Sequence, residues 1–328
     1  MFELLCGPGF FRITLALLVF VDHATRIELG TAAVYIFFEL SGYWICRMWL
    51  DRYSRTRSSY LTYLISRFWR LLPVFMLASI IAWTLLAWGQ QTNICPLSVH
   101  QLLSNILIFG YHSLPCQVNV PAWSLDVEMQ FYLIAPLAIL LAKRNPLLIL
   151  TISVVISAFA VQLGDSFTMA PYFAFFSIGV VAGSTGWQPS ARLAKISLST
   201  TILLFSICVL SPVRDIILGG AHPQGIFYQY NGKVEIIIAF LIAPWAIFTT
   251  KQRSSRFDRM LGDLSYVFYL IHFPILVVMN TGIGSYALRL EKIGVALVMI
   301  GTVSVAIWLF FDRPINRRRA IWVSHRTK

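Results

Sequence analysis

The sequence predicts an all-α protein, a polytopic membrane helix bundle of about ten transmembrane helices with both termini in the cytoplasm. The 328-residue chain is 58% hydrophobic and only 12% charged, and its mean hydropathy is +0.72. A typical globular domain is about half apolar and about a quarter charged. Apolar runs near the length that crosses roughly 30 Å of hydrocarbon recur along the whole chain. This pattern predicts one integral-membrane domain over residues 1–328 with no appended soluble domain.

The distribution of basic residues supports this topology. The formal charge of +12 is concentrated in short gaps between apolar runs, which is typical of membrane topology and argues against nucleic acid as a partner. Alternate gaps are rich in Arg and Lys, and the positive-inside rule places those gaps in the cytoplasm. The predicted spans cover residues 8–25, 30–50, 68–88, 123–142, 146–163, 168–185, 196–212, 234–250, 262–281 and 293–312.

In chain order, the first two spans are apolar runs that contain a few ionisable residues. The third follows a basic gap and the fourth follows the longest outer gap, which runs from about 89 to 122. The sixth and seventh are short, and the sixth contains Gly179 and Gly183. The last three are predominantly apolar, and each is flanked by basic residues on its predicted inner side.

Cysteine usage indicates no metal centre. No Cys/His spacing resembles a zinc site, and no glycine-rich phosphate loop is present. Cys95 and Cys116 share the long outer gap, where either a disulfide or two free thiols would be chemically permitted. The remaining cysteines lie in or beside spans and are interpreted as small apolar fillers.

The first span contains the most informative pair of residues. Arg12 and His23 are eleven residues apart, about three helical turns, so both side chains leave the same face about 16 Å apart along the axis. Ionisable side chains inside a membrane are costly and usually mark a functional site or path.

Two carboxylates open the fourth span, in the run Trp123-Ser-Leu-Asp-Val-Glu128. Glu128 is expected at the depth of His23. A carboxylate beside an imidazole fixes the tautomer of the imidazole, so this pair suggests a general base and the residue that orients it. Asp126 is the competing carboxylate, on roughly the opposite face. Alternatively, Glu128 closes a buried hydrogen-bond network.

Further polar residues fall at membrane depth. Glu39 and Ser41 lie in the middle of the second span, and His272 lies in the middle of the ninth, where a packing role is the alternative. Arg67 and Arg70 share one face at the cytoplasmic start of the third span and suit phosphate, although arginines flanking a span also serve as lipid-headgroup anchors. The basic tail 317–319 is interpreted as a topology signal.

Five short motifs occur in an order that resembles the acyltransferase-3 family of integral membrane acyltransferases. The motifs are Arg12-x10-His23, Phe37-Phe-Glu-Leu-Ser-Gly42, Arg67-x-x-Arg70, Trp123-Ser-Leu-Asp-Val-Glu128 and Leu261-Gly-Asp-Leu-Ser-Tyr266 through Tyr269-Leu-Ile-His272. The resemblance covers nearly the whole chain. It departs at Gly9-Phe-Phe-Arg12, where the family often has Leu-Asp-x-Leu-Arg and only the arginine matches.

The resemblance implies transfer of an acyl group, commonly acetyl from acetyl-CoA, to a hydroxyl of an extracytoplasmic or lipid-linked saccharide. It implies a multi-pass protein of the bacterial cytoplasmic membrane, with membrane lipid, a saccharide or glycolipid acceptor and polysaccharide-assembly proteins as partners. Acetyl-CoA is then a donor substrate, and no permanently bound cofactor or metal is expected. We expect His23 as general base oriented by Glu128, and donor phosphates at Arg12, Arg67 and Arg70. The residues expected to contact the acceptor or the acyl group are Trp123, Ser124, Tyr132, Glu39, Ser41 and His272.

Other functions fit parts of the pattern. Intramembrane charges also suit a carrier or flippase for a glycan or lipid-linked intermediate, but no matching pair of broken helices occurs in two halves of the chain. A purely structural membrane subunit leaves Arg12, His23 and Glu128 without a role. The sequence does not separate direct transfer from a covalent acyl relay, and it names neither the acceptor, the acyl chain nor the oligomeric state.

Overall fold

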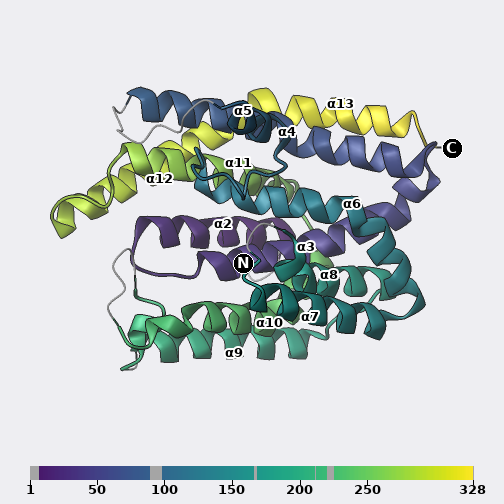
Figure 1. Ribbon diagram of the computed structural model, residues 1–328, viewed down its shortest axis with the longest axis horizontal. Helices are drawn as coiled ribbons and strands as arrows, with labels where there is room; N and C mark the ends of the chain where they lie inside the picture. The colour runs from purple at the N-terminus through teal and green to yellow at the C-terminus, as the bar shows by residue number, and fades with distance from the viewer. Residues whose placement is uncertain (1–6, 89–97, 166–167, 211, 220–224, 328) are drawn as a thin grey trace.

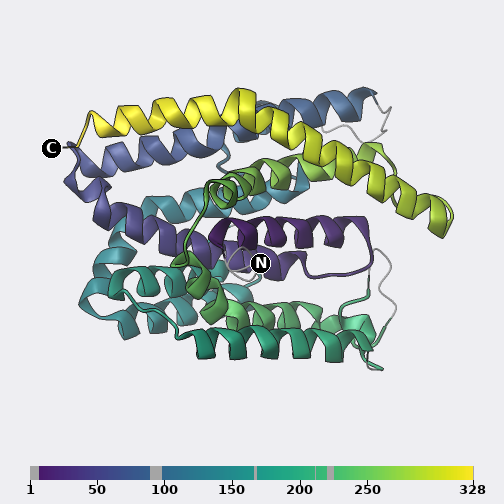
Figure 2. The same cartoon turned by 180° about the vertical axis from the view of Figure 1, so that it is seen from behind.

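The computed structural model describes residues 7–88, 98–165, 168–210, 212–219 and 225–327, and it is all-helical over these residues apart from one isolated bridge between Thr56 and Thr327. Long helices run side by side, with α2 in the interior of the bundle (Figures 1 and 2). The long helices are α2 (Pro8–Ala24), α3 (Gly30–Asp51), α4 (Ser59–Trp88), α6 (Trp123–Arg144), α7 (Pro146–Gln162), α8 (Phe173–Thr185), α9 (Ala191–Leu210), α10 (Asn231–Thr250), α11 (Arg256–Val278) and α12 (Tyr286–Ile307).

Each predicted span coincides with one of these helices. Within the described part of the chain, six helical stretches are long and apolar enough to cross a membrane. They are Ser59–Trp88, Val120–Arg144, Ala191–Leu210, Tyr228–Thr250, Arg256–Val278 and Tyr286–Ser324. Pro146–Gln162 and Ala170–Thr185 are shorter apolar helices. The fold is therefore that of a membrane helix bundle, as predicted.

Two helix boundaries differ from the prediction in ways that affect the site. Helix α4 begins at Ser59, so Arg67 and Arg70 lie more than two turns inside the helix instead of at its start. Helix α12 does not end the fold, because a π-helical turn, Trp308–Asp312, continues it into α13 (Arg313–Ser324). Both extensions contain several polar residues, so apolar runs alone do not predict them.

Close packing of α2 on α11 sets the position of Arg12. The Asp258 carboxylate accepts hydrogen bonds from the backbone N–H groups of Gly9 (3.2 Å) and Phe10 (2.8 Å), and so caps the first turn of α2. A Cβ atom at Gly9 would lie 1.7 Å from the Asp258 carbonyl oxygen. Only glycine permits this approach of the two backbones, which holds the start of α2 against α11.

Helices α3 and α8 also meet through small residues, as is common between membrane helices. A Cβ at Gly42 would lie 2.1 Å from the Phe176 carbonyl oxygen, and one at Gly179 would lie 1.9 Å from the Glu39 carbonyl oxygen. Stacked rings of Phe38 and Phe176, with centroids 4.6 Å apart, fill the space beside this contact. The glycines of the short sixth span thus serve as packing sites.

The segment before α6 is anchored in the protein by several buried side chains. This segment follows the short helix α5 (Val99–Leu107) and ends with the 3-10 turn Val120–Ala122. Its residues Ile108, Tyr111, Asn119 and Ala122 are each fully buried. Asn119 is held at both ends, because its backbone N–H donates to the Tyr111 hydroxyl (2.8 Å) and its side-chain amide donates to the Leu270 carbonyl oxygen (2.8 Å). Cys116 in this segment is disulfide-bonded, whereas Cys95 lies outside the described residues.

Replacing Gly179 with leucine should prevent the α3–α8 contact, because the new side chain would overlap the backbone of α3. We expect loss of monodisperse protein on size-exclusion chromatography in detergent. Gly294→Leu in α12 is the matched control, since a Cβ there meets nothing within 4 Å. Normal yield of the Gly179→Leu variant would show that the two backbones do not need this close approach.

Candidate active site

A cavity of about 660 Å³ lies among α2, α3, α4, α6, α11 and α13. One end is where α2 and α11 begin and where α3 and α10 end, and it is lined by Gly9, Met48, Gln252 and Arg259. The opposite end is closed by Phe37, Ser124 and Tyr269, among other residues. The cavity therefore runs from one end of the bundle into its interior.

Most of the predicted binding residues meet in this cavity. The three predicted donor-binding arginines line it, together with Ser41, Ser124, Glu128 and Tyr132. Among the described residues that line the cavity, four predicted site residues are missing: His23, His272, Glu39 and Trp123. Trp123 instead packs between Phe38 and Tyr172, and Glu39 is fully buried with both carboxyl oxygens lacking a hydrogen-bond partner among the described residues.

The cavity wall has an excess of positive charge. Its described lining contains five arginines, at positions 12, 67, 70, 259 and 319, but only two carboxylates, Glu128 and Asp263. Arg12 is half-buried and interacts electrostatically with Glu128 and Asp263, and its Nε atom has no hydrogen-bond partner among the described residues. A surplus of guanidinium groups in a confined space favours an anionic ligand.

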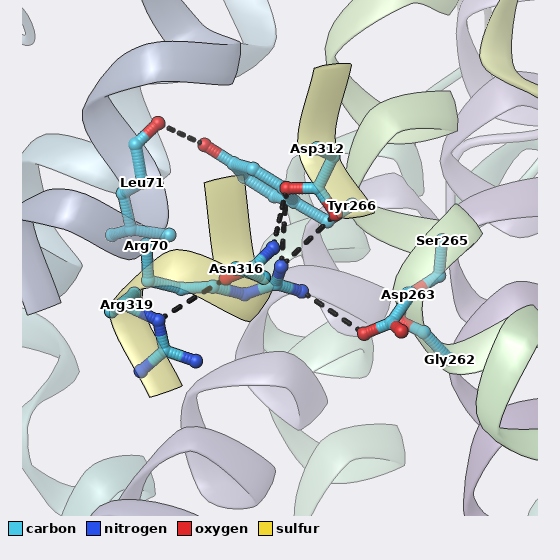
Figure 3. Close-up of polar contacts among 9 residues, drawn as sticks. All are labelled: Arg70, Leu71, Gly262, Asp263, Ser265, Tyr266, Asp312, Asn316 and Arg319. Atoms are coloured by element: carbon cyan, nitrogen blue, oxygen red, sulfur yellow. Dashed lines mark hydrogen bonds and ion pairs between the residues drawn. The ribbon is translucent and has the colours of Figure 1, made fainter. Parts of the chain in front are cut away.

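The positive charge of Arg70 is neutralised by two aspartates. Figure 3 shows its guanidinium between Asp312, at 3.1 Å, and Asp263, at 3.4 Å. Its guanidinium carbon also lies 5.6 Å from the centroid of the Tyr266 ring. Arg67 and Arg70, which the sequence places on one face of a helix, both line this cavity, but their surroundings differ.

Arg67 and Arg319 are held by neutral groups. Arg67, with 5% of its surface exposed, donates from Nη2 to the Tyr53 hydroxyl (2.8 Å), and Arg319 donates from Nη1 to the Ser66 hydroxyl (2.9 Å). The two hydroxyls are themselves 2.7 Å apart. Tyr53 lies in the loop between α3 and α4. Burial alone would raise its pKa, but Arg67, Ser66 and Arg319 lower it below the ordinary value, as expected in a positive field.

Glu128 has different neighbours from those predicted. Its Oε1 atom accepts hydrogen bonds from Ser41 and from Tyr132, each at 2.5 Å. The competing carboxylate, Asp126, is fully buried and accepts from the backbone N–H of His112 (3.0 Å) and from the Gln130 amide (3.0 Å). Of the two carboxylates in the run 123–128, Glu128 thus lines the cavity, and Asp126 binds the backbone of the segment that precedes α6.

His23 pairs with His272 instead of Glu128. Nδ1 of His23 lies 2.9 Å from Nε2 of His272, and Nδ1 of His272 lies 2.7 Å from the Tyr269 carbonyl oxygen. Because a carbonyl only accepts, we assign the proton of neutral His272 to Nδ1. Its Nε2 then accepts from His23 Nδ1, which leaves the lone pair of His23 on Nε2. His272 is therefore the residue that orients the first-span histidine.

The depth of α6 explains why Glu128 misses His23. The first turn of α6 lies at the level of Tyr269, whose hydroxyl bonds Ser124 (2.8 Å) and the Pro121 carbonyl (2.8 Å). From that level Glu128 lies about one turn towards the cavity, whereas His272 lies about one turn in the opposite direction. Pro274 in α11 lacks an N–H for the Leu270 carbonyl, which instead accepts from Asn119 and holds this arrangement.

Tyr269 connects the cavity with the histidine pair, and the sequence prediction missed its role. It lines the closed end of the cavity, and its ring centroid lies 5.9 Å from that of His272, which is fully buried. The three-residue spacing of Tyr269 and His272 places them on one face of a helix, which is the signal that could have identified the tyrosine. Within the described residues, no group of three or more His, Cys, Asp or Glu side chains could hold a metal ion.

Comparison with known proteins identifies the family. A sequence profile described as an acyltransferase domain matches residues 7–311. The chain belongs to the acyltransferase-3 family. Curated relatives include the O-acetyltransferase OatA of Staphylococcus aureus strains NCTC 8325 / PS 47 and COL, each 23% identical over 338 aligned residues that cover 93% of this chain and 55% of the relative. The chain thus spans about half the length of these curated relatives. No solved structure matches it.

In this acyltransferase-3 protein, Asp312→Asn should lower stability more than Asp263→Asn. The Asp312 side chain is 2% exposed and Asp263 is 52% exposed, so removing the buried charge leaves Arg70 poorly paired and costs about 3 kcal/mol, against about 0–1 kcal/mol for the exposed partner. Thermal unfolding in detergent compares the two variants. Equal midpoints would contradict the assignment of Asp312 as the main counter-ion.

Proposed function

We propose that this protein transfers an acetyl group from acetyl-CoA to a hydroxyl of an extracytoplasmic or lipid-linked saccharide. The observation that supports this best is the cavity, which has surplus arginine charge at one end and leads towards a hydrogen-bonded histidine pair. Membership of the acyltransferase-3 family and the O-acetyltransferase name of the Staphylococcus aureus relatives support the same reaction class.

The proposal includes a topology. The ten helices that match the predicted spans, including the shorter α7 and α8, would all cross a bacterial cytoplasmic membrane, with both termini inside. The arginine-lined end of the cavity lies where α2 and α11 begin, beside the basic segment between α10 and α11, which the positive-inside rule places in the cytoplasm. Acetyl-CoA is anionic at its nucleotide end, so this end of the cavity suits its phosphates. Its thioester would extend inward along α2.

His23 is the proposed general base. Its Nε2 would take the proton of the acceptor hydroxyl as the hydroxyl oxygen attacks the thioester carbonyl carbon. The carbon–sulfur bond then breaks and the thiolate of CoA leaves. A positioned base of this kind is worth about 10²–10⁴-fold in rate. Proton loss from the acceptor leaves positive charge on His23, and His272 can stabilise it through its acceptor Nε2.

The side chains at the closed end of the cavity have supporting roles in this scheme. Ser124 and Tyr269 present hydroxyls where the thioester would arrive, and either can donate to the oxyanion of the tetrahedral intermediate. Glu128 positions Ser41 and Tyr132 along the wall of the donor path and balances part of the charge of Arg12. Because Tyr269 stands between the cavity and His272, transfer requires its side chain to move aside.

Replacing His23 with alanine should reduce acetyl transfer by about 10²-fold or more, because no other base replaces its Nε2. The assay uses purified protein in liposomes with labelled acetyl-CoA and an acceptor glycan, and it counts label on the glycan. His325→Ala is the matched control, since His325 is exposed near the C-terminal end.

Two results would contradict the proposal. Full transfer by the His23→Ala variant would remove the histidine from the chemistry. Failure of the wild-type protein to move label from CoA, combined with passage of glycan across the bilayer, would favour a carrier instead. Loss of transfer in both histidine variants would indicate a general defect, which the elution profile of each protein on size-exclusion chromatography would reveal.

A further inference from the structure

We infer that Arg319 of the C-terminal helix joins Arg67 in a phosphate-binding site at the inner end of the cavity. This site would take a phosphate group of a soluble nucleotide, which is the charged end of an acyl-CoA if the proposed function holds. The sequence analysis interprets the basic tail 317–319 as a topology signal. In the structure Arg317 and Arg318 are exposed, whereas Arg319 lines the cavity.

The chain that follows Arg319, in α13 and just beyond it, is fixed in place by several contacts. Arg52 donates to the Ala320 carbonyl oxygen (2.9 Å), and the backbone N–H of Arg57 donates to the Arg326 carbonyl oxygen (2.8 Å). Val323 is fully buried, and Trp322 packs against Trp69 of α4, with ring centroids 5.7 Å apart. The C-terminal helix is therefore part of the cavity wall.

A series of hydrogen bonds fixes the orientation of the Arg319 side chain. Its Nε donates to Asn316 Oδ1 (3.2 Å), and the Asn316 amide donates in turn to Asp312 (2.8 Å), the carboxylate that neutralises Arg70 (Figure 3). The other end of the guanidinium is held by Ser66 (2.9 Å). Because both ends are fixed, the guanidinium is oriented before any ligand arrives.

The hydroxyls of Tyr53 and Ser66 link Arg319 to Arg67 without cancelling either charge. The sequence of contacts is Arg67 to Tyr53, Tyr53 to Ser66, and Ser66 to Arg319. Among the described residues, the side chains that accept hydrogen bonds from these two guanidiniums are all neutral, in contrast to the two aspartates of Arg70. In addition, Nε of Arg67 is buried and lacks a hydrogen-bond partner within the described part of the chain.

Two oriented, unneutralised guanidiniums in one buried wall are suited to a phosphate group. Burying charge without a counter-ion is costly, and guanidinium forks match phosphate oxygens with short, charge-assisted hydrogen bonds. The same chemistry is present on an anionic lipid headgroup. The cavity location, inside the bundle between α4, α11 and α13, favours a soluble ligand that extends inward.

The test compares Arg319→Gln with Arg318→Gln, a neighbouring change on an exposed face of the same helix. Binding of adenosine 3′,5′-bisphosphate to protein in phosphatidylglycerol-containing nanodiscs is measured by calorimetry, together with KM for acetyl-CoA. We expect the Arg319→Gln variant to bind the bisphosphate about 10–100-fold more weakly and to show a similar rise in KM, since a lost charge-assisted contact is worth that much. Arg318→Gln should match the wild-type protein.

Unchanged bisphosphate affinity in Arg319→Gln would overturn the inference, as would equal weakening in both variants or no binding by the wild-type protein. A lipid-headgroup site would give the first of these results, because the soluble nucleotide would not compete for it. If the bisphosphate binds through Arg319 but no acetyl group leaves CoA, the phosphate site stands and the proposed function alone fails. Conversely, transfer from acetyl-CoA with an unaltered KM in Arg319→Gln would support the proposed function and overturn the phosphate site.

Discussion

A guanidinium inside a membrane bundle needs hydrogen bonds or a counter-ion, and the arginine-lined end of the cavity is arranged around that need. Arg70 receives two aspartates, one from α11 and one from the π-helical turn after α12. Arg67 and Arg319 receive only hydroxyl and amide partners among the described residues. The first arrangement ties three helices together, and the second leaves positive charge facing a cavity. Arg67 and Arg70, which the sequence presents as an equivalent pair, thus have different partners: hydroxyl groups bind Arg67, and carboxylates bind Arg70.

The part of the site around Tyr269 and the histidine pair depends on a proline. Because Pro274 has no N–H, it leaves the Leu270 carbonyl oxygen without its usual helical donor. The Asn119 side-chain amide donates to this oxygen and so holds the segment before α6 against α11. This places Ser124 against Tyr269, and the Tyr269 carbonyl then orients His272 against His23. Tyr269 therefore links the two parts of the site. It lines the cavity, and its ring centroid lies 5.9 Å from that of His272.

Sequence patterns located the helices well because apolar runs of membrane length are unambiguous in a chain with few charges. They placed the start of α4 late, since Arg67 was treated as the edge of a span, and they missed α13 because its exposed face is basic. The partner of His23 was misjudged for another reason. The depth of Glu128 depends on where α6 begins relative to the other helices. Residues 108–122, which precede α6, have no periodic pattern that would predict this level. The histidine in the ninth span was identified, but its contact with His23 is a tertiary property.

The position of each end of the donor is tested most directly by a cryo-electron microscopy structure with a non-hydrolysable acetyl-CoA analogue. The nucleotide phosphates should lie between Arg67 and Arg319, and the acetyl carbonyl should lie beside Ser124 and Tyr269. An analogue bound with its phosphates remote from these arginines, or with its acetyl group towards α13, would contradict the proposed path of the donor.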